Sequence, residues 1–182
     1  KIVTDFLDKE PASIVQEYRN SKYYHKYKIK DMLRIDYSID KYFDEACACN
    51  PNRTVSRKKI WDDNPQFVLK NGKLNTDLDC IRTITTKQDR NPNSGNLYFD
   101  SGIEGRSKFR YLTPRECLLF MGFTDKDYEN IIKDNPNHHG TTLFPRDKII
   151  RMAGNSIPVK LLEGIFLQIK KLDQLLTNDF ID

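Results

Sequence analysis

A cluster of basic and amide side chains in the middle of the chain has the chemistry needed to contact the edges of nucleic-acid bases. Arg82, Lys87, Gln88 and Arg90 flank the short run Thr83–Thr86. Arginine forms two hydrogen bonds to guanine and glutamine forms two to adenine, so such a cluster suits recognition in the major groove. An exposed hairpin held by salt bridges explains the same residues equally well. Residue types and spacing alone leave both interpretations open.

The excess positive charge of the chain is concentrated around this cluster. The 182 residues carry 30 basic and 26 acidic side chains, and residues 50–90 hold nine basic against five acidic, whereas the flanking segments are balanced. The excess includes Arg57-Lys58-Lys59, which lies just before Trp61. A local positive field favours phosphate binding because neutralised phosphates release condensed counterions. Charge by itself does not distinguish such a surface from a solvated basic loop.

The thiols and imidazoles do not have the spacing of a metal site. Cys47 and Cys49 are separated by one residue, whereas structural zinc sites favour two to four. His138 and His139 are adjacent, point in different directions and lack a carboxylate partner, which is typical of a surface loop. We therefore expect no metal, and free thiols in a reducing cytoplasm. The four cysteines are Cys47, Cys49, Cys80 and Cys117.

Local patterns predict a mixed α and β fold and no membrane span. No apolar run approaches the roughly 18 to 20 residues that a transmembrane helix needs. Thr113, Pro114 and Glu116 form a capping box at the start of a helix that Gly122 ends. Asn71-Gly72 predicts a hairpin turn. Strands are expected over residues 66–70, 80–86 and 97–99, and further helices over residues 12–18, 125–133 and 157–176.

Two stretches near the C-terminus resemble the sequence blocks of a known enzyme family. They are Arg110-Tyr-Leu-Thr-Pro-Arg-Glu-Cys-Leu-Leu-Phe-Met-Gly-Phe123 and Arg151-Met-Ala-Gly-Asn-Ser-Ile-Pro-Val-Lys-Leu-Leu-Glu-Gly-Ile-Phe166. In order and separation, they look like the last two blocks of the bacterial DNA (cytosine-5)-methyltransferases. The resemblance is strong over residues 80–170 and weak over residues 1–79, as expected of a variable specificity region.

The resemblance implies roles for two groups of residues. Asn155 and Ser156, in a turn after Gly154, would contact S-adenosylmethionine, although either could instead cap the helix that follows. Thr83–Thr86 would lie against the backbone of a nucleotide flipped out of the duplex. The implied DNA-binding residues are Arg82, Thr83, Ile84, Thr85, Thr86, Lys87, Gln88 and Arg90. Arg110, Arg115 and Glu116 would pair with one another and organise the structure.

The catalytic blocks of that family are not found in this sequence. Its nucleophile is a cysteine that follows a proline, but the residues before the four cysteines are Ala46, Ala48, Asp79 and Glu116. Glu129-Asn130-Ile131 only superficially resembles the family's glutamate block and is expected on a helix surface. We therefore expect no catalytic residue in this chain and no activity from the chain alone. Because it begins at Lys1, it is expected to be a piece of a longer protein or one subunit of a split enzyme.

These expectations together define a domain plan. Residues 1–109 would form a β-rich target-recognition region, residues 110–176 a C-terminal helical segment and residues 177–182 a tail. The helices would pack on a Rossmann-like sheet of the missing half, or residues 158–172 would form a homodimer. Expected partners are double-stranded DNA and that half, in a cytoplasmic restriction-modification system. The alternatives are a non-catalytic nucleic-acid-binding module, or RNA binding by the Tyr- and Lys-rich residues 18–42.

Overall fold

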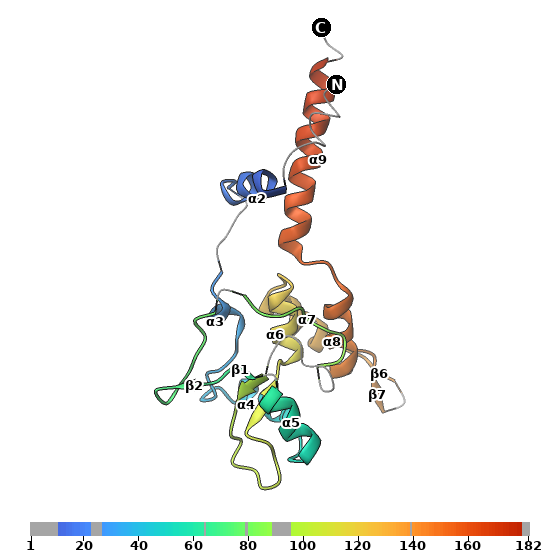
Figure 1. Cartoon of the computed structure of the whole chain (residues 1–182). Coiled ribbons are helices and arrows are strands. Elements are labelled where there is room, and N and C mark those ends of the chain that lie inside the picture. The colour runs from blue at the N-terminus through green and yellow to red at the C-terminus, as the bar shows by residue number, and fades with distance from the viewer. Residues whose placement is uncertain are drawn as a thin grey trace. The chain divides into compact units, whose positions relative to one another are not determined.

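The computed structural model describes residues 11–22, 27–63, 65–78, 80–88, 96–138 and 140–179. The chain divides into two compact units, one formed by residues 27–156 and the other by residues 1–26 together with residues 157–182 (Figure 1). Among the described residues, no helix has both the length and the apolar character needed to cross a lipid bilayer.

The 27–156 unit contains a small three-stranded sheet. Strands β1 (Pro65–Phe67), β4 (Asn96–Tyr98) and β5 (Phe109–Tyr111) are arranged in the order β1-β4-β5. β1 runs parallel to β4, and β4 runs antiparallel to β5, with Leu97 opposite Arg110. Phe67 and Leu97 are completely buried, so the sheet contributes directly to the hydrophobic core.

Helices supply much of the rest of the core. α6 (Pro114–Phe120) packs against α7 (Asp125–Lys133) and α8 (Arg146–Asn155). The buried apolar side chains of α6 and α8 include Leu118, Ile149 and Ile150. Three further helices precede the sheet in the chain: α3 (Ile29–Met32), α4 (Asp40–Ala48) and α5 (Val55–Asp63).

Two hairpins complete the 27–156 unit. β2 (Leu69–Lys70) pairs with β3 (Lys73–Leu74) through a turn in which Asn71 and Gly72 both have positive φ angles, 52° and 74°. This confirms the Asn-Gly hairpin turn, which requires positive φ at both positions. β6 (Asn137–His138) pairs with β7 (Thr141–Thr142) where a loop was expected. His139 lies outside the described residues.

The helix start predicted from the capping box at Thr113 is confirmed. Thr113 accepts a hydrogen bond from the Glu116 backbone, Glu116 accepts one from the Thr113 backbone, and Pro114 is the first residue of α6. Gly122 follows the helix with a φ angle of 91°, the left-handed conformation that glycine adopts most easily. Thr124 and Asp127 repeat the capping box at α7.

The second unit pairs a short helix with a long one. α2 (Pro11–Arg19) packs against α9 (Val159–Asp179), and the Tyr18 hydroxyl donates to Glu163 at 3.1 Å. Lys171 forms an ion pair with Glu17 at 2.7 Å. Both helices were predicted from the sequence, although each is slightly longer than expected.

The mixed α/β fold class is confirmed, but one strand prediction is wrong. Residues 80–88 form no strand and no ladder with any described strand, and the segment has a bend at Thr86 and a turn at Gln88. Strand propensity reflects packing against neighbouring strands, and here the segment lies against a helix instead. Helices α4 and α5 were not predicted, and they occupy part of the region that was expected to be rich in strands.

Candidate nucleic-acid interface

The segment 80–88 contains both buried and exposed side chains. Ile84 is 7% exposed and joins the hydrophobic core, whereas Arg82, Thr83 and Lys87 are exposed. Thr85 and Thr86 are half-buried, and Arg90 lies outside the described residues. The exposed members thus form a basic, hydroxyl-bearing edge that Ile84 anchors to the protein.

Gln88 faces inward rather than toward solvent. Its side chain is 1% exposed, and its Nε2 donates to the carbonyl oxygen and to the hydroxyl of Thr85, both at 3.3 Å. A buried amide with these bonds stabilises the local conformation of the segment. The structure therefore separates Gln88 from the exposed residues with which it was grouped.

Helix α8 brings the start of the second sequence block, residues 151–166, against the 80–88 segment. Gly154, in its last turn, lies so close to the peptide between Thr85 and Thr86 that a Cβ added there would be 2.7 Å from both Thr85 C and Thr86 N. No real side chain tolerates such a contact with backbone atoms, so only glycine allows the helix and the segment to approach. The glycine at this position is thus explained by packing within the protein.

The end of α8 also fixes the positions of Asn155 and Ser156. Asn155 is the last residue of the helix and is exposed. Ser156 is the C-cap, and its backbone N–H and hydroxyl both donate to the Ala153 carbonyl, at 3.1 and 2.7 Å. The expected free turn at Gly154–Ser156 is wrong, because α8 was not predicted and includes its first two residues.

A cavity of about 200 Å³ lies between α8 and residues 86–88. Lys87 and Arg151 contribute positive charge to its wall, and Asp147 contributes negative charge. Tyr111 and the buried Gln88 also line it. The cavity is polar and small. Arg151, which belongs to the second sequence block, lines it together with Lys87 of the 80–88 segment.

Buried ion pairs hold the helices that support this interface. Glu116 accepts four N–H bonds, two from the Arg110 guanidinium at 2.7 and 2.8 Å and one each from the backbones of Thr113 and Arg34 at 2.9 Å. Burial opposes the charged form of Arg110, but the Glu116 carboxylate outweighs it and raises the pKa of Arg110 above its ordinary value. The predicted pairing of Arg110 with Glu116 is present.

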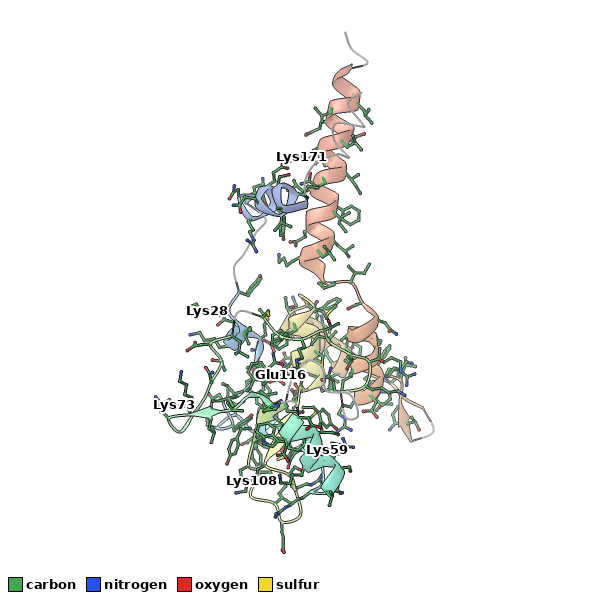
Figure 2. The ribbon with its side chains drawn as sticks, in the orientation of Figure 1. Lys28, Lys59, Lys73, Lys108, Glu116 and Lys171 are labelled. Atoms are coloured by element: carbon green, nitrogen blue, oxygen red, sulfur yellow. The ribbon has the colours of Figure 1, made fainter. Side chains whose placement is uncertain are left out.

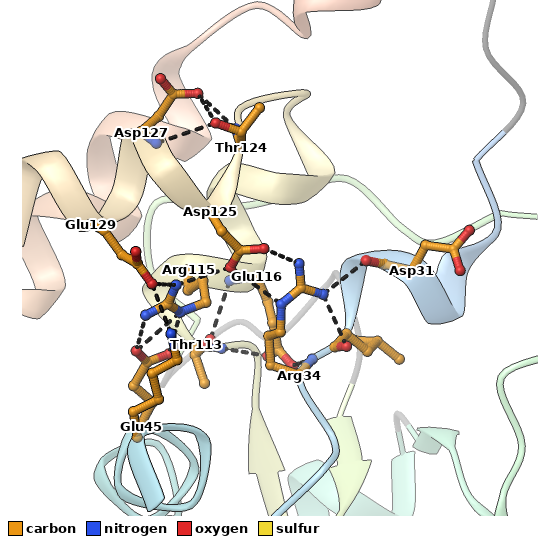
Figure 3. Close-up of polar contacts among 12 residues, drawn as sticks. Asp31, Arg34, Glu45, Thr113, Arg115, Glu116, Thr124, Asp125, Asp127 and Glu129 are labelled. Carbon is orange, nitrogen blue, oxygen red and sulfur yellow. Dashed lines mark hydrogen bonds and ion pairs between the residues drawn. The ribbon is translucent and has the colours of Figure 1, made fainter. Parts of the chain in front are cut away.

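Arg115 is also an organising residue, with partners that the sequence did not indicate. Its side chain is 4% exposed and contacts Glu45 at 2.8 Å, Asp125 at 2.9 Å and Glu129 at 3.2 Å (Figure 3). Its guanidinium also lies 4.4 Å from the ring centre of Tyr128. The prediction that Arg115 pairs with Glu116 is therefore wrong, because carboxylates from α4 and α7 surround it.

Asp125 links Arg115 to a second arginine. The Arg34 guanidinium donates to the Asp125 carboxylate and to the carbonyl oxygen of Asp31 (Figure 3). Desolvation raises the pKa of Asp125, but the hydrogen bonds from Arg34 and Arg115 have the larger combined effect and lower it below its ordinary value. Glu129, from the block resembling the family's glutamate block, lies on α7 and pairs with Lys41 and Arg115.

The thiols are not arranged as nucleophiles. Burial raises the pKa of Cys49 to about 12 and raises that of Cys117 well above its ordinary value. A reactive cysteine needs a lowered pKa, because the thiolate is the attacking species. Cys47 is half-buried and its pKa is also raised by desolvation, whereas Cys80 is exposed. The described residues contain no group of three or more side chains suited to holding a metal ion.

Comparison with known proteins identifies the family. A family model described as C-5 cytosine-specific DNA methylase matches residues 3–171, which is most of the chain. A comparison with curated proteins found no match. Members of this family use S-adenosylmethionine and act on DNA, which agrees with the resemblance of the sequence blocks at residues 110–123 and 151–166. The chain therefore belongs to the C-5 cytosine-specific DNA methylase family.

Proposed function

We propose that this chain is the C-terminal part of a DNA (cytosine-5)-methyltransferase, and that it recognises duplex DNA and completes the cofactor pocket. The contact of Gly154 with the Thr85–Thr86 peptide carries the proposal. It joins the segment assigned to DNA contact to the block assigned to S-adenosylmethionine within the 27–156 unit. A bacterial restriction-modification system in the cytoplasm is the setting that the resemblance implies.

DNA contact is assigned to the exposed edge of the 80–88 segment. Arg82 and Lys87 supply positive charge, and Thr83 supplies a short hydroxyl that can approach a phosphate closely. Ile84 and Gln88 act as anchors, because both are buried. In this proposal residues 1–109 provide target recognition, residues 110–176 belong to the methyltransferase domain and residues 177–182 form a tail.

The end of α8 has donors that fit the polar end of S-adenosylmethionine. Asn155 presents an exposed amide, and Ser156 keeps lone pairs available although its hydrogen bonds Ala153. A helix C-terminus carries partial negative charge, which favours a cationic ammonium or sulfonium group. When bound, the cofactor supplies the methyl group, while Asn155 and Ser156 would hold and orient it.

The reaction itself requires groups from outside this chain. No cysteine follows a proline in the sequence, and Cys49 and Cys117 are buried thiols with raised pKa values. α9 exposes a large apolar surface, with Leu161 55% and Phe166 63% exposed. A contiguous apolar face of this kind indicates a protein partner. We assign it to the catalytic half, which would cover α9 with its Rossmann-like sheet.

Reconstitution tests this proposal directly. The chain is mixed with a polypeptide that carries the missing catalytic blocks, and transfer of a radiolabelled methyl group to duplex DNA is measured. We expect transfer from the mixture and none from the chain alone. Robust transfer by the purified chain would contradict the absence of a nucleophile, and no transfer with any such partner would refute assignment to an enzyme.

The same experiment also tests a second candidate function. A non-catalytic nucleic-acid-binding module would also have an exposed basic edge and no nucleophile. It would bind duplex DNA with the same affinity whether or not the catalytic half is present, and it would never support methyl transfer. Self-association through residues 158–172 would appear in sedimentation as a dimer that the catalytic half dissociates.

A further inference from the structure

A second basic pocket lies in the 27–156 unit, apart from the 80–88 segment. It has a volume of about 500 Å³, within the range of ligand-binding clefts. No carboxylate is among the described residues that line it. Its polar lining includes three arginines, Arg57, Arg106 and Arg146, together with Asn50, Asn52, Thr54 and Tyr111, the last of which also lines the first cavity.

Backbone hydrogen bonds give this pocket a fixed wall. The segment after α4 runs beside the segment that leads into β5, with Ser107 N–H donating to Pro51 at 2.9 Å and Arg53 N–H donating to Gly105 at 2.7 Å. The side chain of Asn50 is 2% exposed and its Nδ2 donates to Ser107 and Phe109, at 2.8 and 2.7 Å. The wall is therefore ordered before any ligand arrives.

Arg106 and Arg146 are placed by contacts that use only part of their hydrogen-bonding capacity. Arg106 Nη1 donates to the Asn50 carbonyl at 2.8 Å. Arg146 donates to the Ala48 carbonyl, contacts Asp147 at 3.3 Å and lies 5.8 Å from the ring centre of Tyr111. Because a guanidinium has five N–H donors, these contacts orient Arg106 and Arg146 and leave donors that can bind an anion.

Packing of α5 places the third arginine at the pocket. Trp61 stacks on Phe109 of β5, with ring centres 5.4 Å apart and an interplanar angle of 13°. Thr54 caps the start of α5, because its hydroxyl accepts a hydrogen bond from the Arg57 backbone N–H at 3.2 Å. Thr54 therefore precedes α5 directly, Arg57 lies on its first turn, and Arg146 is the first residue of α8. Both helix N-termini add partial positive charge to the pocket.

We propose that the pocket lined by Arg57, Arg106 and Arg146 binds the tetrahedral oxyanion of a phosphate group. Three arginines that line one pocket, a lining that includes amides and hydroxyls, and the absence of a carboxylate among the described lining residues all fit this ligand and disfavour a cation. The phosphate belongs either to the backbone of bound DNA, which rests on the proposed function, or to a free phosphate ion.

A titration of the intact 182-residue chain with inorganic phosphate is the first test. Side-chain NMR signals of Arg57 and Arg106 are followed, and we expect saturable shifts confined to the pocket. Arg57→Gln is the matched variant, with Lys59→Gln as its control, because Lys59 is on the same helix, carries the same charge and does not line the pocket (Figure 2). The first variant should lose the saturable shift and the second should keep it.

Duplex binding distinguishes the two sources of phosphate. Affinity is measured by fluorescence anisotropy over a range of salt concentrations for the chain, Arg57→Gln, the double variant Arg57→Gln with Arg106→Gln, and Lys59→Gln. If the phosphate is from DNA, the slope of log affinity against log salt should fall by about 1 for the first variant and about 2 for the double variant. If the ligand is a free phosphate ion, Arg57→Gln should bind duplex DNA with the same affinity as Lys59→Gln. The unchanged chain should still show saturable phosphate binding.

Two results would overturn the proposal. One is the absence of saturable phosphate binding together with equal duplex affinities for Arg57→Gln and Lys59→Gln, which would show only a general electrostatic field. The other is phosphate shifts that persist unchanged in Arg57→Gln. Circular dichroism verifies that each variant is folded. Methyl transfer in the reconstituted mixture is measured separately. A negative result for phosphate binding at the pocket would therefore not refute the proposed function.

Discussion

The guanidinium of Arg110 and the carboxylate of Glu116 form a two-bond ion pair in which both side chains have 0% exposure. The pair joins β5 to the first turn of α6, and Figure 2 shows Glu116 in the interior of the 27–156 unit. Removing two charges from water is costly, so such a pair stabilises only when the remaining hydrogen-bonding groups are also satisfied. Here the backbones of Thr113 and Arg34 complete the coordination of Glu116.

Glu116→Gln is expected to lower the free energy of unfolding by about 3–5 kcal/mol, because it leaves the Arg110 charge buried without its counter-ion. Chemical denaturation followed by circular dichroism measures the change. The double variant Arg110→Met with Glu116→Leu removes both charges and should recover much of the loss. A single variant as stable as the wild-type chain would show that the pair does not hold α6 on the sheet.

Gly154→Ala should push α8 away from the 80–88 segment. The added methyl group would meet the Thr85–Thr86 backbone at 2.7 Å, and backbone atoms cannot move aside as a flexible side chain can. We expect a loss of about 1–3 kcal/mol, as for other overpacked sites, with NMR shifts at Thr85 and Thr86. Gly164→Ala is the matched control, since its Cβ would lie 3.6 Å from the Tyr18 ring in ordinary contact. That variant should be neutral or stabilising, because alanine favours helix.

Asp125→Asn should alter the acid side of the stability profile. The pKa of Asp125 is lowered in the folded chain, so its contribution is complete above its unfolded pKa, near 3.8, and is lost as pH falls through the lower folded value. The wild-type chain should therefore lose stability between about pH 5 and pH 2, and Asp125→Asn should lose less over the same interval. Thermal unfolding at a series of pH values measures this. Parallel profiles for the two proteins would exclude Asp125 as a contributor.

Local signals predicted parts of this structure well. Thr113, Pro114 and Glu116 lie within four residues, so the start of α6 is determined by nearby backbone groups that the sequence displays. The Asn71-Gly72 turn is equally local, because its positive φ angles depend on those two residues. The 125–133 helix was predicted at its observed boundaries, and the structure shows that Thr124 caps it.

Features that depend on distant partners were not predictable in this way. The β-branched residues of the 80–86 segment suggested a strand, but Gly154, which lies far along the chain, determines what it packs against. Arg115 was paired with the neighbouring Glu116, whereas its partners Glu45 and Glu129 come from other helices. α8 was not predicted, because the sequence Asn-Ser-Ile-Pro after Gly154 resembles the start of a helix. The structure shows that Asn155 is instead the last residue of α8. The pocket of three arginines is likewise assembled from separate segments.

The four cysteines should differ sharply in reactivity toward an alkylating agent. Cys80 is exposed, whereas burial raises the pKa of Cys49 to about 12 and also raises that of Cys117. At pH 8, iodoacetamide should therefore modify Cys80 first in the native chain, and Cys49 and Cys117 only after unfolding. Peptide mass spectrometry over time measures the order. Modification of Cys117 as fast as that of Cys80 would indicate an accessible thiolate in α6. It would contradict the proposal that this chain supplies no nucleophile.

Arg82→Gln combined with Lys87→Gln should weaken duplex DNA binding without unfolding the chain, because both side chains are exposed. The salt slope of the affinity should fall by about 2, the effect of losing two phosphate contacts. Lys133→Gln, an exposed charge change on α7, is the control and should leave the slope unchanged.

Gln88→Ala separates an anchoring role from base recognition within the same segment. The variant removes the hydrogen bonds to Thr85 and should lower stability by about 1–3 kcal/mol while the folded fraction binds DNA with unchanged affinity. Thermal unfolding and fluorescence anisotropy on the same sample give the two quantities. Loss of affinity for adenine-containing sites at full stability would instead mean that Gln88 turns outward to contact a base, in conflict with its burial.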